Sequence, residues 1–372
     1  MSTTKKIVLL PGDGIGPEVT EQAIKVSREA AKLNDIELET EEYTVGGKSI
    51  DENGVPVTDE AMEACKKADA VFLGAVGGPK WDNVDKSIRP EAALLRLRNE
   101  LGLFTNLRPI KVFDALVGAS SLKKEIVKDI DLMVVRELTG GIYFGEPRKT
   151  VQIGEQEEEA TDSLVYRTSE IKRITEAAFD VARKRNRSKK VTSVDKSNIL
   201  DTSRLWRKTV TEMAETNTDI ELEHMLVDNC AMQLVRYPAQ FDVIVTGNMF
   251  GDILSDEAAM ITGSIGMLPS ASLGTGTAMY EPVHGSAPDI AGSGKANPLA
   301  AIGSAAMMFR YSFNAPEAAD AIESAVEQVL NDGLRTVDLQ SESSETHVAT
   351  TEEMTQQILT KIAKKKENHA NA

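Results

Sequence analysis

The sequence alternates short, almost wholly apolar runs with longer stretches that have helical periodicity. Five of the short runs predict buried strands: KKIVLL (5–10), DAVFLGAVG (69–77), DLMVVREL (131–138), KKVTSVDK (189–196) and FDVIVTGN (241–248). Five stretches with apolar residues at helical spacing predict helices at 17–33, 89–101, 168–186, 201–217 and 298–310. Strands that alternate with helices form a largely parallel sheet covered by helices. The pattern therefore predicts an α/β fold.

Charge and cysteine content exclude several classes of function. The 372 residues include 42 Lys and Arg against 58 Asp and Glu, a net charge of −16. This argues against unaided binding of nucleic acids or anionic membranes, because phosphate affinity requires a cationic face. Two cysteines provide neither a disulfide framework nor a thiolate zinc site. No run approaches the roughly 18 apolar residues of a membrane span, so a cytoplasmic protein is expected.

Three glycine-rich segments are candidate ligand loops. GDGIG (12–16) joins a predicted strand to a predicted helix, where amides can hold an anion, but its spacing is not the dinucleotide fingerprint and a plain tight turn is an equal alternative. GAVGGP (74–79) is similarly ambiguous. HGSAPDIAGSGKANP (284–298) is the better cofactor candidate, because Asp289 could accept from a ribose diol and would repel a 2′-phosphate, favouring NAD over NADP. An ordered loop without a ligand is the alternative.

Arginines, a tyrosine and a lysine suggest chemistry on an anionic substrate. Arg98, Arg108 and Arg136 are candidate ligands of carboxylates, which guanidinium groups bind bidentately, although a solvated arginine is the alternative for each. Tyr143 lies in a glycine-rich turn and is either a packing residue or a proton donor. Lys196 follows a predicted strand and is either a base or a solvated lysine.

Asp252 and Asp256 carry the sharpest chemical signal. They lie one turn apart on a predicted helix, where two like charges repel unless something offsets them. A divalent cation with oxygen ligands would do so, with Asp228 as a third carboxylate, and such a set suits Mg²⁺ or Mn²⁺ better than Zn²⁺. Solvated aspartates near a helix N-terminus are the alternative. Combined with the arginines and the NAD loop, the site suits oxidative decarboxylation of a 2-hydroxy acid.

Long motifs in a definite order along the chain, from residue 9 to about residue 362, resemble those of the β-decarboxylating dehydrogenases of the isocitrate/isopropylmalate type. They include LLPGDGIGPEV, GAVGGPKWD, RPEAALLRLR, VRELTGGIYFGEPR, VDKSNIL, VDNCAMQLVR, TGNMFGDILSDEAA and HGSAPDIAGSGKANP. The resemblance implies that Arg98, Arg108 and Arg136 bind the carboxylates of the substrate. It implies that Lys196 removes the hydroxyl proton, directly or through a water molecule, and that Tyr143 protonates the carbon left after decarboxylation.

The resemblance also implies the cofactor ligands. Asp228, Asp252 and Asp256 would bind Mg²⁺ or Mn²⁺, with Asp228 also close to the substrate. The residues implied to contact or lie near NAD are Gly77, Gly78, Glu281, His284, Gly285, Ser286, Ala287, Asp289, Ile290 and Asn297.

The predicted helix at 89–101 is implied to select the substrate. Isocitrate-specific relatives have a serine and an asparagine before the first arginine, whereas this chain has Glu91, Leu94 and Leu95. Leucines suit an isopropyl group, and a carboxylate buried beside Glu91 without a partner would be unfavourable. The implied reaction is NAD-dependent oxidative decarboxylation of (2R,3S)-3-isopropylmalate to 4-methyl-2-oxopentanoate, through 2-isopropyl-3-oxosuccinate, in leucine biosynthesis. A related enzyme acting on tartrate, malate or homoisocitrate is the alternative.

The implied fold is a two-lobed α/β/α sandwich with a shared central mixed sheet, distinct from the Rossmann fold. Residues 1–105 plus 263–372 would form the cofactor-binding lobe, and 106–262 the lobe for substrate, metal and dimerisation. The resemblance implies an obligate homodimer with shared active sites, in which Lys196 and Asp228 serve the neighbouring subunit. The acidic segment 154–163 would belong to a hairpin arm that intertwines between subunits.

Overall fold

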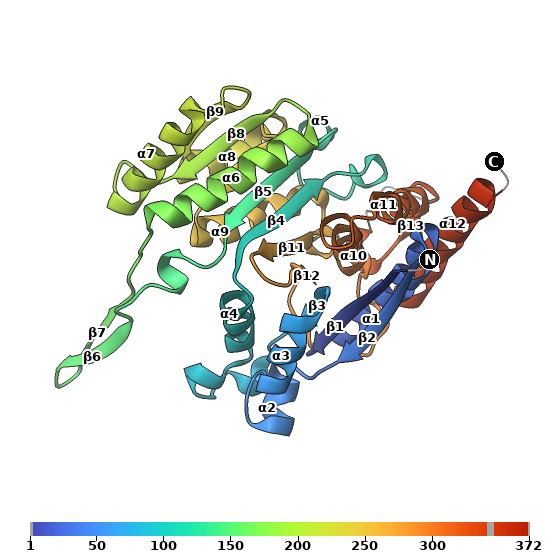
Figure 1. Ribbon diagram of the computed structural model, residues 1–372, viewed down its shortest axis with the longest axis horizontal. Helices are drawn as coiled ribbons and strands as arrows, with labels where there is room; N and C mark the ends of the chain where they lie inside the picture. The colour runs from blue at the N-terminus through green and yellow to red at the C-terminus, as the bar shows by residue number, and fades with distance from the viewer. Residues whose placement is uncertain (1–2, 341–345, 371–372) are drawn as a thin grey trace. The chain divides into compact units, whose positions relative to one another are not determined.

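The computed structural model describes residues 3–340 and 346–370, and the chain divides into two compact units (Figure 1). Unit 1 consists of Met1–Leu103, Val112–Asp129 and Ala259–Ala372, and unit 2 consists of Phe104–Lys111 and Ile130–Ala258. This division differs from the predicted lobes chiefly at 112–129, which lies in unit 1. Arg335 ties that segment to unit 1, because its Nη2 donates to Ala115 O at 2.6 Å.

Unit 1 contains a mixed set of strands in the order β2-β1-β3-β12-β11. β1 is parallel to β2 and β3, β12 is parallel to β3, and β11 is antiparallel to β12. A short parallel pair, β13 and β14, is separate. The strands are β1 (Thr3–Gly12), β2 (Ile36–Glu42), β3 (Ala70–Ala75), β11 (Pro269–Gly274), β12 (Met279–Pro282), β13 (Leu334–Arg335) and β14 (His347–Val348). The helices are α1 (Gly16–Ala31), α2 (Gly47–Asn53), α3 (Asp59–Lys67), α4 (Pro90–Glu100), α5 (Lys124–Val127), α10 (Leu299–Tyr311), α11 (Pro316–Asn331) and α12 (Thr351–Ala370).

Helix α1 shows how the sequence produces these elements. Pro17 occupies the first turn, where its missing N–H has no helical partner to lose. Val19, Ala23, Val26 and Ala30 recur at helical spacing, and all four are fully buried. The apolar stripe of α1 therefore packs against β3 and α10.

Unit 2 has strands in the order β4-β5-β10-β8-β9. β4 and β5 are antiparallel, and the pairs β5–β10, β10–β8 and β8–β9 are parallel. The strands are β4 (Leu103–Lys111), β5 (Asp131–Glu137), β6 (Lys149–Gly154), β7 (Glu157–Thr161), β8 (Lys190–Asp195), β9 (Glu221–Leu226) and β10 (Val243–Thr246). The helices are α6 (Thr168–Arg185), α7 (Asp201–Glu215), α8 (Val227–Arg236) and α9 (Asn248–Ala259).

The register of the unit 2 strands aligns their carboxyl ends. Thr246 of β10 pairs with Arg136 of β5 on one side and with Val194 of β8 on the other. These three strands are almost entirely buried, as expected for parallel strands covered on both faces. The residues just beyond the ends of β5, β8 and β10 therefore lie along one edge of these strands, where open α/β sheets place ligands.

The acidic segment forms the predicted hairpin. β6 and β7 are antiparallel, and most of their side chains are exposed. In Figure 1 this hairpin (green) extends away from the other elements of unit 2. A hairpin of two strands is marginally stable alone, so the arm needs a further contact to hold its conformation.

The five predicted strands and five predicted helices are confirmed, with boundaries shifted by a few residues. Seven of the described strands were missed: β2, β4, β9, β11, β12, β13 and β14. β2 reads IELETEE, which is polar because it lies at an end of its sheet, and β4 contains Pro109, which argues against a strand. In the described part of the chain, no helix has the length and hydropathy required to cross a bilayer.

Candidate functional site

The pairing of β4 with β5 brings two arginines into unit 2's candidate site. Asn106 lies opposite Arg136, and Arg108 lies two residues further along β4 on the same face. Arg136 is 2% exposed and Arg108 is 6% exposed. Buried guanidinium groups remain charged and need anionic partners, and helix α9 supplies these partners.

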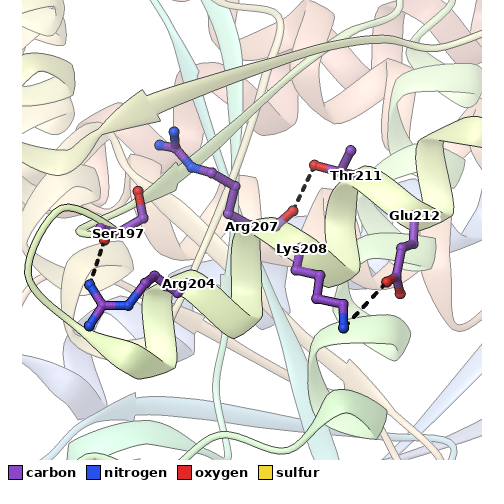
Figure 2. Close-up of a pocket in the computed structure, with 6 residues that line it drawn as sticks. All are labelled: Ser197, Arg204, Arg207, Lys208, Thr211 and Glu212. Carbon is purple, nitrogen blue, oxygen red and sulfur yellow. Dashed lines mark hydrogen bonds and ion pairs between the residues drawn. The ribbon is translucent and has the colours of Figure 1, made fainter.

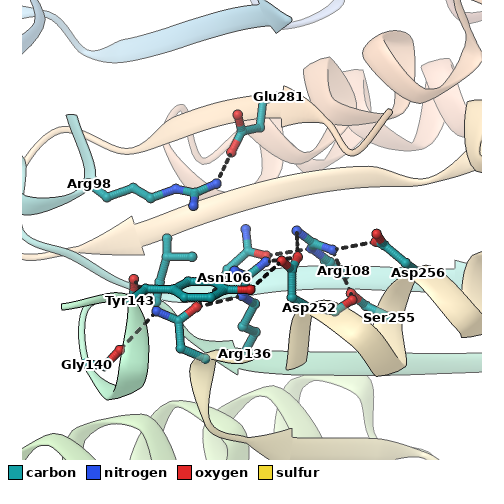
Figure 3. Close-up of polar contacts among 12 residues, drawn as sticks. Arg98, Asn106, Arg108, Arg136, Gly140, Tyr143, Asp252, Ser255, Asp256 and Glu281 are labelled. Atoms are coloured by element: carbon teal, nitrogen blue, oxygen red, sulfur yellow. Dashed lines mark hydrogen bonds and ion pairs between the residues drawn. The ribbon is translucent and has the colours of Figure 1, made fainter. Parts of the chain in front are cut away.

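Arg108 connects β4 to helix α9 (Figure 3). Its Nη1 donates to Ser255 Oγ at 2.6 Å and to Asp256 Oδ1 at 3.0 Å, and its Nη2 donates to Asp252 Oδ1 at 3.3 Å. Its Nε donates to Asn106 Oδ1 at 2.8 Å. The structure therefore brings Asp252 and Asp256 to the same guanidinium group.

Arg136 is held by a second residue of α9, Asn248. Its Nε and Nη2 donate to Asn248 Oδ1 at 3.0 and 2.9 Å, and its Nη1 donates to Asp252 Oδ1. The side-chain nitrogen of Asn248, Nδ2, donates to Leu138 O and Gly140 O, both at 3.1 Å. Asn248 therefore joins β5, the start of α9 and the turn that leads to Tyr143.

Tyr143 faces the same carboxylate. Its hydroxyl donates to Asp252 Oδ2 at 3.1 Å, and the Arg136 guanidinium lies 5.8 Å from its ring centre. Burial, and secondly the charge of Asp252, raise the pKa of Tyr143. A tyrosine hydroxyl is protonated at neutral pH even at its ordinary pKa of 10.0, and the raised pKa leaves the proton available for transfer.

The carboxylates of Asp252 and Asp256 fit a divalent cation. Both lie beside Arg108, and burial raises the pKa of Asp256 despite that arginine. The site therefore favours additional positive charge that would keep this carboxyl ionised. Its oxygen donors suit Mg²⁺ or Mn²⁺. Within residues 3–340 and 346–365, no cluster of three His, Cys, Asp or Glu side chains could hold a metal ion, so one chain does not bring Asp228 to this pair.

Lys196 and Asp228 form a pair of their own. Lys196 follows the last residue of β8, and its Nζ donates to Asp228 Oδ1 at 2.6 Å. This hydrogen bond is the main cause of the lowered pKa of Asp228, which lies in the first turn of α8. The candidate base and the third candidate metal ligand are thus neighbours in the folded chain.

Helix α4 carries the candidate specificity residues in unit 1. Leu94 and Leu95 are half-buried and Glu91 is exposed. Arg98 Nη2 donates to Glu281 Oε1 at 3.2 Å, while its Nε is buried with no hydrogen-bond partner among the described residues. A buried donor without a partner is unfavourable, so Arg98 retains capacity for an anionic ligand.

The candidate cofactor loop follows β12. His284 Nε2 is buried with no partner in the part of the chain that the structure describes, and burial lowers the pKa of His284. A Cβ atom added at Gly285, Gly292 or Gly294 would meet no atom within 4 Å, so the backbone there is open to a ligand. Asp289 is exposed, and Ala287 has a positive φ of 37°. An orphaned buried nitrogen beside open backbone fits a nucleotide.

The other candidate cofactor residues are placed as follows. Asn297 is buried, and its Nδ2 donates to Asp338 Oδ2 at 2.9 Å. Ser286 is buried, and its carbonyl accepts from Ile15 N at 2.8 Å. Ile290 is half-buried. Gly77 N donates to Asp13 Oδ2 at 2.8 Å, and Gly78 lies beside the ring of Trp81.

A cavity of about 460 Å³ lies on α7, apart from the residues above (Figure 2). Three cations line it, but Arg204 pairs with Asp201, Arg207 with Asp195, and Lys208 with Glu212. These pairs compensate the charges that line the cavity, and none of the predicted site residues lines it.

Four polar residues of this region were missed by sequence reasoning: Asn106, Asn248, Ser255 and Tyr166. Tyr166 accepts from Asn248 N at 2.7 Å and contacts the buried carboxylate of Glu137 at 3.5 Å. Asn106 and Ser255 each bind Arg108. The sequence offers one signal for two of them, because Asn248 and Ser255 share a helical face with Asp252.

Comparison with known proteins shows which family this chain belongs to. The family model described as isocitrate/isopropylmalate dehydrogenase matches residues 6–358. A 3-isopropylmalate dehydrogenase of Aquifex aeolicus is 54% identical over 97% of this chain and 98% of its own length, and one from Pseudomonas fluorescens is 58% identical over 91% of this chain and 94% of its own. The crystal structure of an isocitrate dehydrogenase from Methylococcus capsulatus has a TM-score of 0.85 and 36% identity, covering 96% of this chain and 99% of that one. The predicted fold class is confirmed, and this chain is an oxidoreductase that belongs to the isocitrate/isopropylmalate dehydrogenase family.

Proposed function

We propose that this chain catalyses NAD-dependent oxidative decarboxylation of (2R,3S)-3-isopropylmalate to 4-methyl-2-oxopentanoate, in the leucine pathway of the cytoplasm. The observation that carries the proposal is the cluster in unit 2, where Arg108 and Arg136 converge on Asp252 beside Tyr143. It combines groups for a carboxylate, a divalent cation and a proton transfer. Relatives named 3-isopropylmalate dehydrogenase support the choice of substrate.

Recognition of the substrate rests on arginines and leucines. Arg98, Arg108 and Arg136 bind the two carboxylates of the substrate. Because Arg136 is buried and its guanidinium cannot rotate freely, it fixes the orientation of the carboxylate that it binds. Leu94 and Leu95 contact the isopropyl group. Glu91 disfavours a substrate with a further carboxylate at that position, through like-charge repulsion.

The chain's own groups move the protons. When bound, NAD accepts a hydride from the substrate's carbinol carbon, and Mg²⁺ or Mn²⁺ stabilises negative charge on the neighbouring oxygen. Asp252, Asp256 and Asp228 hold the cation. Lys196 Nζ removes the hydroxyl proton, and the Tyr143 hydroxyl protonates the carbon from which carbon dioxide has left.

A homodimer with shared sites is part of the proposal. Asp228 pairs with Lys196 rather than joining Asp252 and Asp256 in one chain. Helices α8 and α9 also expose apolar side chains, including Met232 at 60% and Ile253 at 58%. A second subunit would cover this surface, complete the acidic ligand set and give the β6–β7 arm the contact it needs.

The direct test follows NADH absorbance with 3-isopropylmalate, NAD and Mg²⁺. We expect turnover that EDTA abolishes and that excess Mg²⁺ or Mn²⁺ restores. Malate, tartrate and homoisocitrate, run in parallel, should have a much lower kcat/KM. Malate and tartrate lack the isopropyl group that Leu94 and Leu95 contact, and homoisocitrate places a further carboxylate where Glu91 repels it. Equal efficiency on malate, or full activity in excess EDTA, would refute the proposal.

A further inference from the structure

Asp13 is a buried carboxylate in the GDGIG turn (12–16), and the proposed reaction gives it no role. It is 5% exposed. Its Oδ2 accepts from Gly47 N and Gly77 N and its Oδ1 accepts from Lys48 N, each at 2.8 Å. In the part of the chain described, its side-chain partners are all backbone amides. A buried carboxylate is stabilised by such convergent donors, because they replace the hydrogen bonds it made with water.

These three amides belong to two separate segments of unit 1. Gly47 and Lys48 are the first residues of α2, so Asp13 caps this helix from a distant part of the sequence. Gly77 follows β3 with a φ of +105°, in the segment proposed to lie beside NAD. One carboxylate therefore fixes both the start of α2 and the segment around Gly77.

The same turn also fixes the loop after β12. Ile15 N donates to Ser286 O at 2.8 Å. A Cβ atom at Gly14 would lie 1.9 Å from Ser286 O, so only glycine allows this close approach. The turn is itself anchored, because Asp13 N donates to Ala75 O at 2.7 Å. The turn is thus the common support of the two segments proposed to contact NAD.

We propose that Asp13 is a positioning residue for the nucleotide: it holds the Gly77 segment at a fixed spacing from the 284–297 loop before NAD binds. The inference rests on the proposed NAD dependence. The two oxygens of Asp13 accept from all three N–H groups, whereas asparagine offers one oxygen and turns its NH₂ group towards a remaining donor. Asp13 touches neither the substrate nor the reacting atoms.

The test uses Asp13→Asn and Asp13→Ala in the full chain, with Thr58→Ala as the matched control. Thr58 caps α3 in the same unit, where its Oγ1 accepts from Ala61 N at 3.2 Å, so its loss removes a helix cap without touching the turn. For both Asp13 variants we expect the NADH dissociation constant, measured by fluorescence titration without turnover, to rise about tenfold or more, the effect of losing a charge-assisted hydrogen bond. The KM for isopropylmalate should change less than about twofold, and Thr58→Ala should bind NADH like the wild type.

Three outcomes are distinguishable. If wild-type protein does not reduce NAD with isopropylmalate, the proposed function fails. If it does, and the Asp13 variants bind NADH as tightly as Thr58→Ala, the positioning role fails. Should neither variant fold, hydrogen exchange of wild-type protein decides: the amides of Gly47, Lys48 and Gly77 should be protected before NADH is added, and rapid exchange at Gly77 without NADH would overturn the inference.

Discussion

Asn248 shows how a single side chain sets the geometry of the proposed active site. Its amide oxygen accepts two hydrogen bonds from Arg136, and its amide nitrogen donates to two carbonyl groups of the turn before Tyr143. All its hydrogen-bonding capacity is used, and it is buried. Removing this side chain would leave its buried partners without hydrogen bonds. The free-energy cost of such unpaired groups exceeds the net stabilisation that the hydrogen bonds provided.

We expect Asn248→Ala to lower kcat/KM for isopropylmalate by about 100-fold, because Arg136 and the Tyr143 turn lose a shared anchor (about 2.7 kcal/mol). The NADH dissociation constant should not change. Steady-state kinetics and fluorescence titration measure the two quantities. Asn53→Ala is the control, since Asn53 is an exposed asparagine of α2. A variant with unaltered kcat/KM would show that Arg136 is positioned without Asn248.

Glu137 gives a pH dependence of stability. It is fully buried, and burial raises the pKa of its carboxyl above its ordinary value of 4.5. The folded state therefore binds this proton more tightly than the unfolded state, so the contribution to stability is complete at low pH and is lost as pH rises through the raised pKa. The Glu137→Gln variant has no titratable carboxyl here, so it does not lose this contribution to stability as pH rises. We expect urea denaturation from pH 4 to 8 to show that the unfolding free energy of the wild type falls relative to that of Glu137→Gln as pH rises. A difference that stays constant with pH would contradict the raised pKa of Glu137.

Among the helices, α9 organises the site through its periodicity. Asn248, Asp252, Ser255 and Asp256 lie at helical spacing on one face, and all four contact Arg108 or Arg136. The helix approaches β5 closely at Gly251. A Cβ atom there would lie 2.6 Å from Cγ and 2.8 Å from Cβ of Arg136. Glycine at 251 is thus required for Arg136 to lie this close to α9 and reach Asp252.

We expect Gly251→Ala to push Arg136 out of place, destabilising the protein by about 1–3 kcal/mol and lowering kcat/KM at least tenfold. Gly303→Ala in α10 is the matched control, because the nearest atom to its added Cβ would be a side-chain carbon of Pro269, at 3.1 Å. Thermal unfolding and steady-state kinetics of both variants provide the comparison. If Gly251→Ala and Gly303→Ala had the same kcat/KM, the close approach at Arg136 would be unimportant for activity.

At the scale of the whole molecule, the candidate active-site residues of unit 2 form two separate groups. Tyr143, Arg108 and Arg136 contact the carboxylates of α9, whereas Lys196 contacts Asp228 of α8. If each active site combines one group from each subunit, two differently inactivated chains can complement each other.

We expect Lys196→Ala and Tyr143→Phe to be inactive alone and to recover activity when unfolded and refolded together. Random pairing gives half hybrid dimers, each with one intact site of two, so activity should approach about a quarter of the wild type. Mixing the variants without unfolding is the control and should give none. An absence of recovery, with hybrid dimers demonstrated by mass spectrometry, would mean that each site is built within one subunit.

Sequence patterns were sufficient where neighbours along the chain decide the structure. The apolar stripe of α1 and the buried run of β3 were both predicted, because burial of such side chains dominates their free energy. The motif resemblance identified Arg108, Arg136, Tyr143 and the two aspartates of α9, and the structure brings these five together. Their roles in binding and proton transfer stay predictions.

What the sequence alone determined about this protein is the α/β pattern, the family and the set of chemically competent residues. Only the tertiary structure decided which of them meet: that Asp228 pairs with Lys196, that Asn248 holds Arg136, and that Asp13 supports the Gly77 segment. The physical reason is that periodicity reports burial within one element, whereas a hydrogen bond between distant segments depends on strand order and register. GDGIG illustrates the difference, since Gly14 is explained by the close approach of Ser286, which is more than 270 residues away in the sequence.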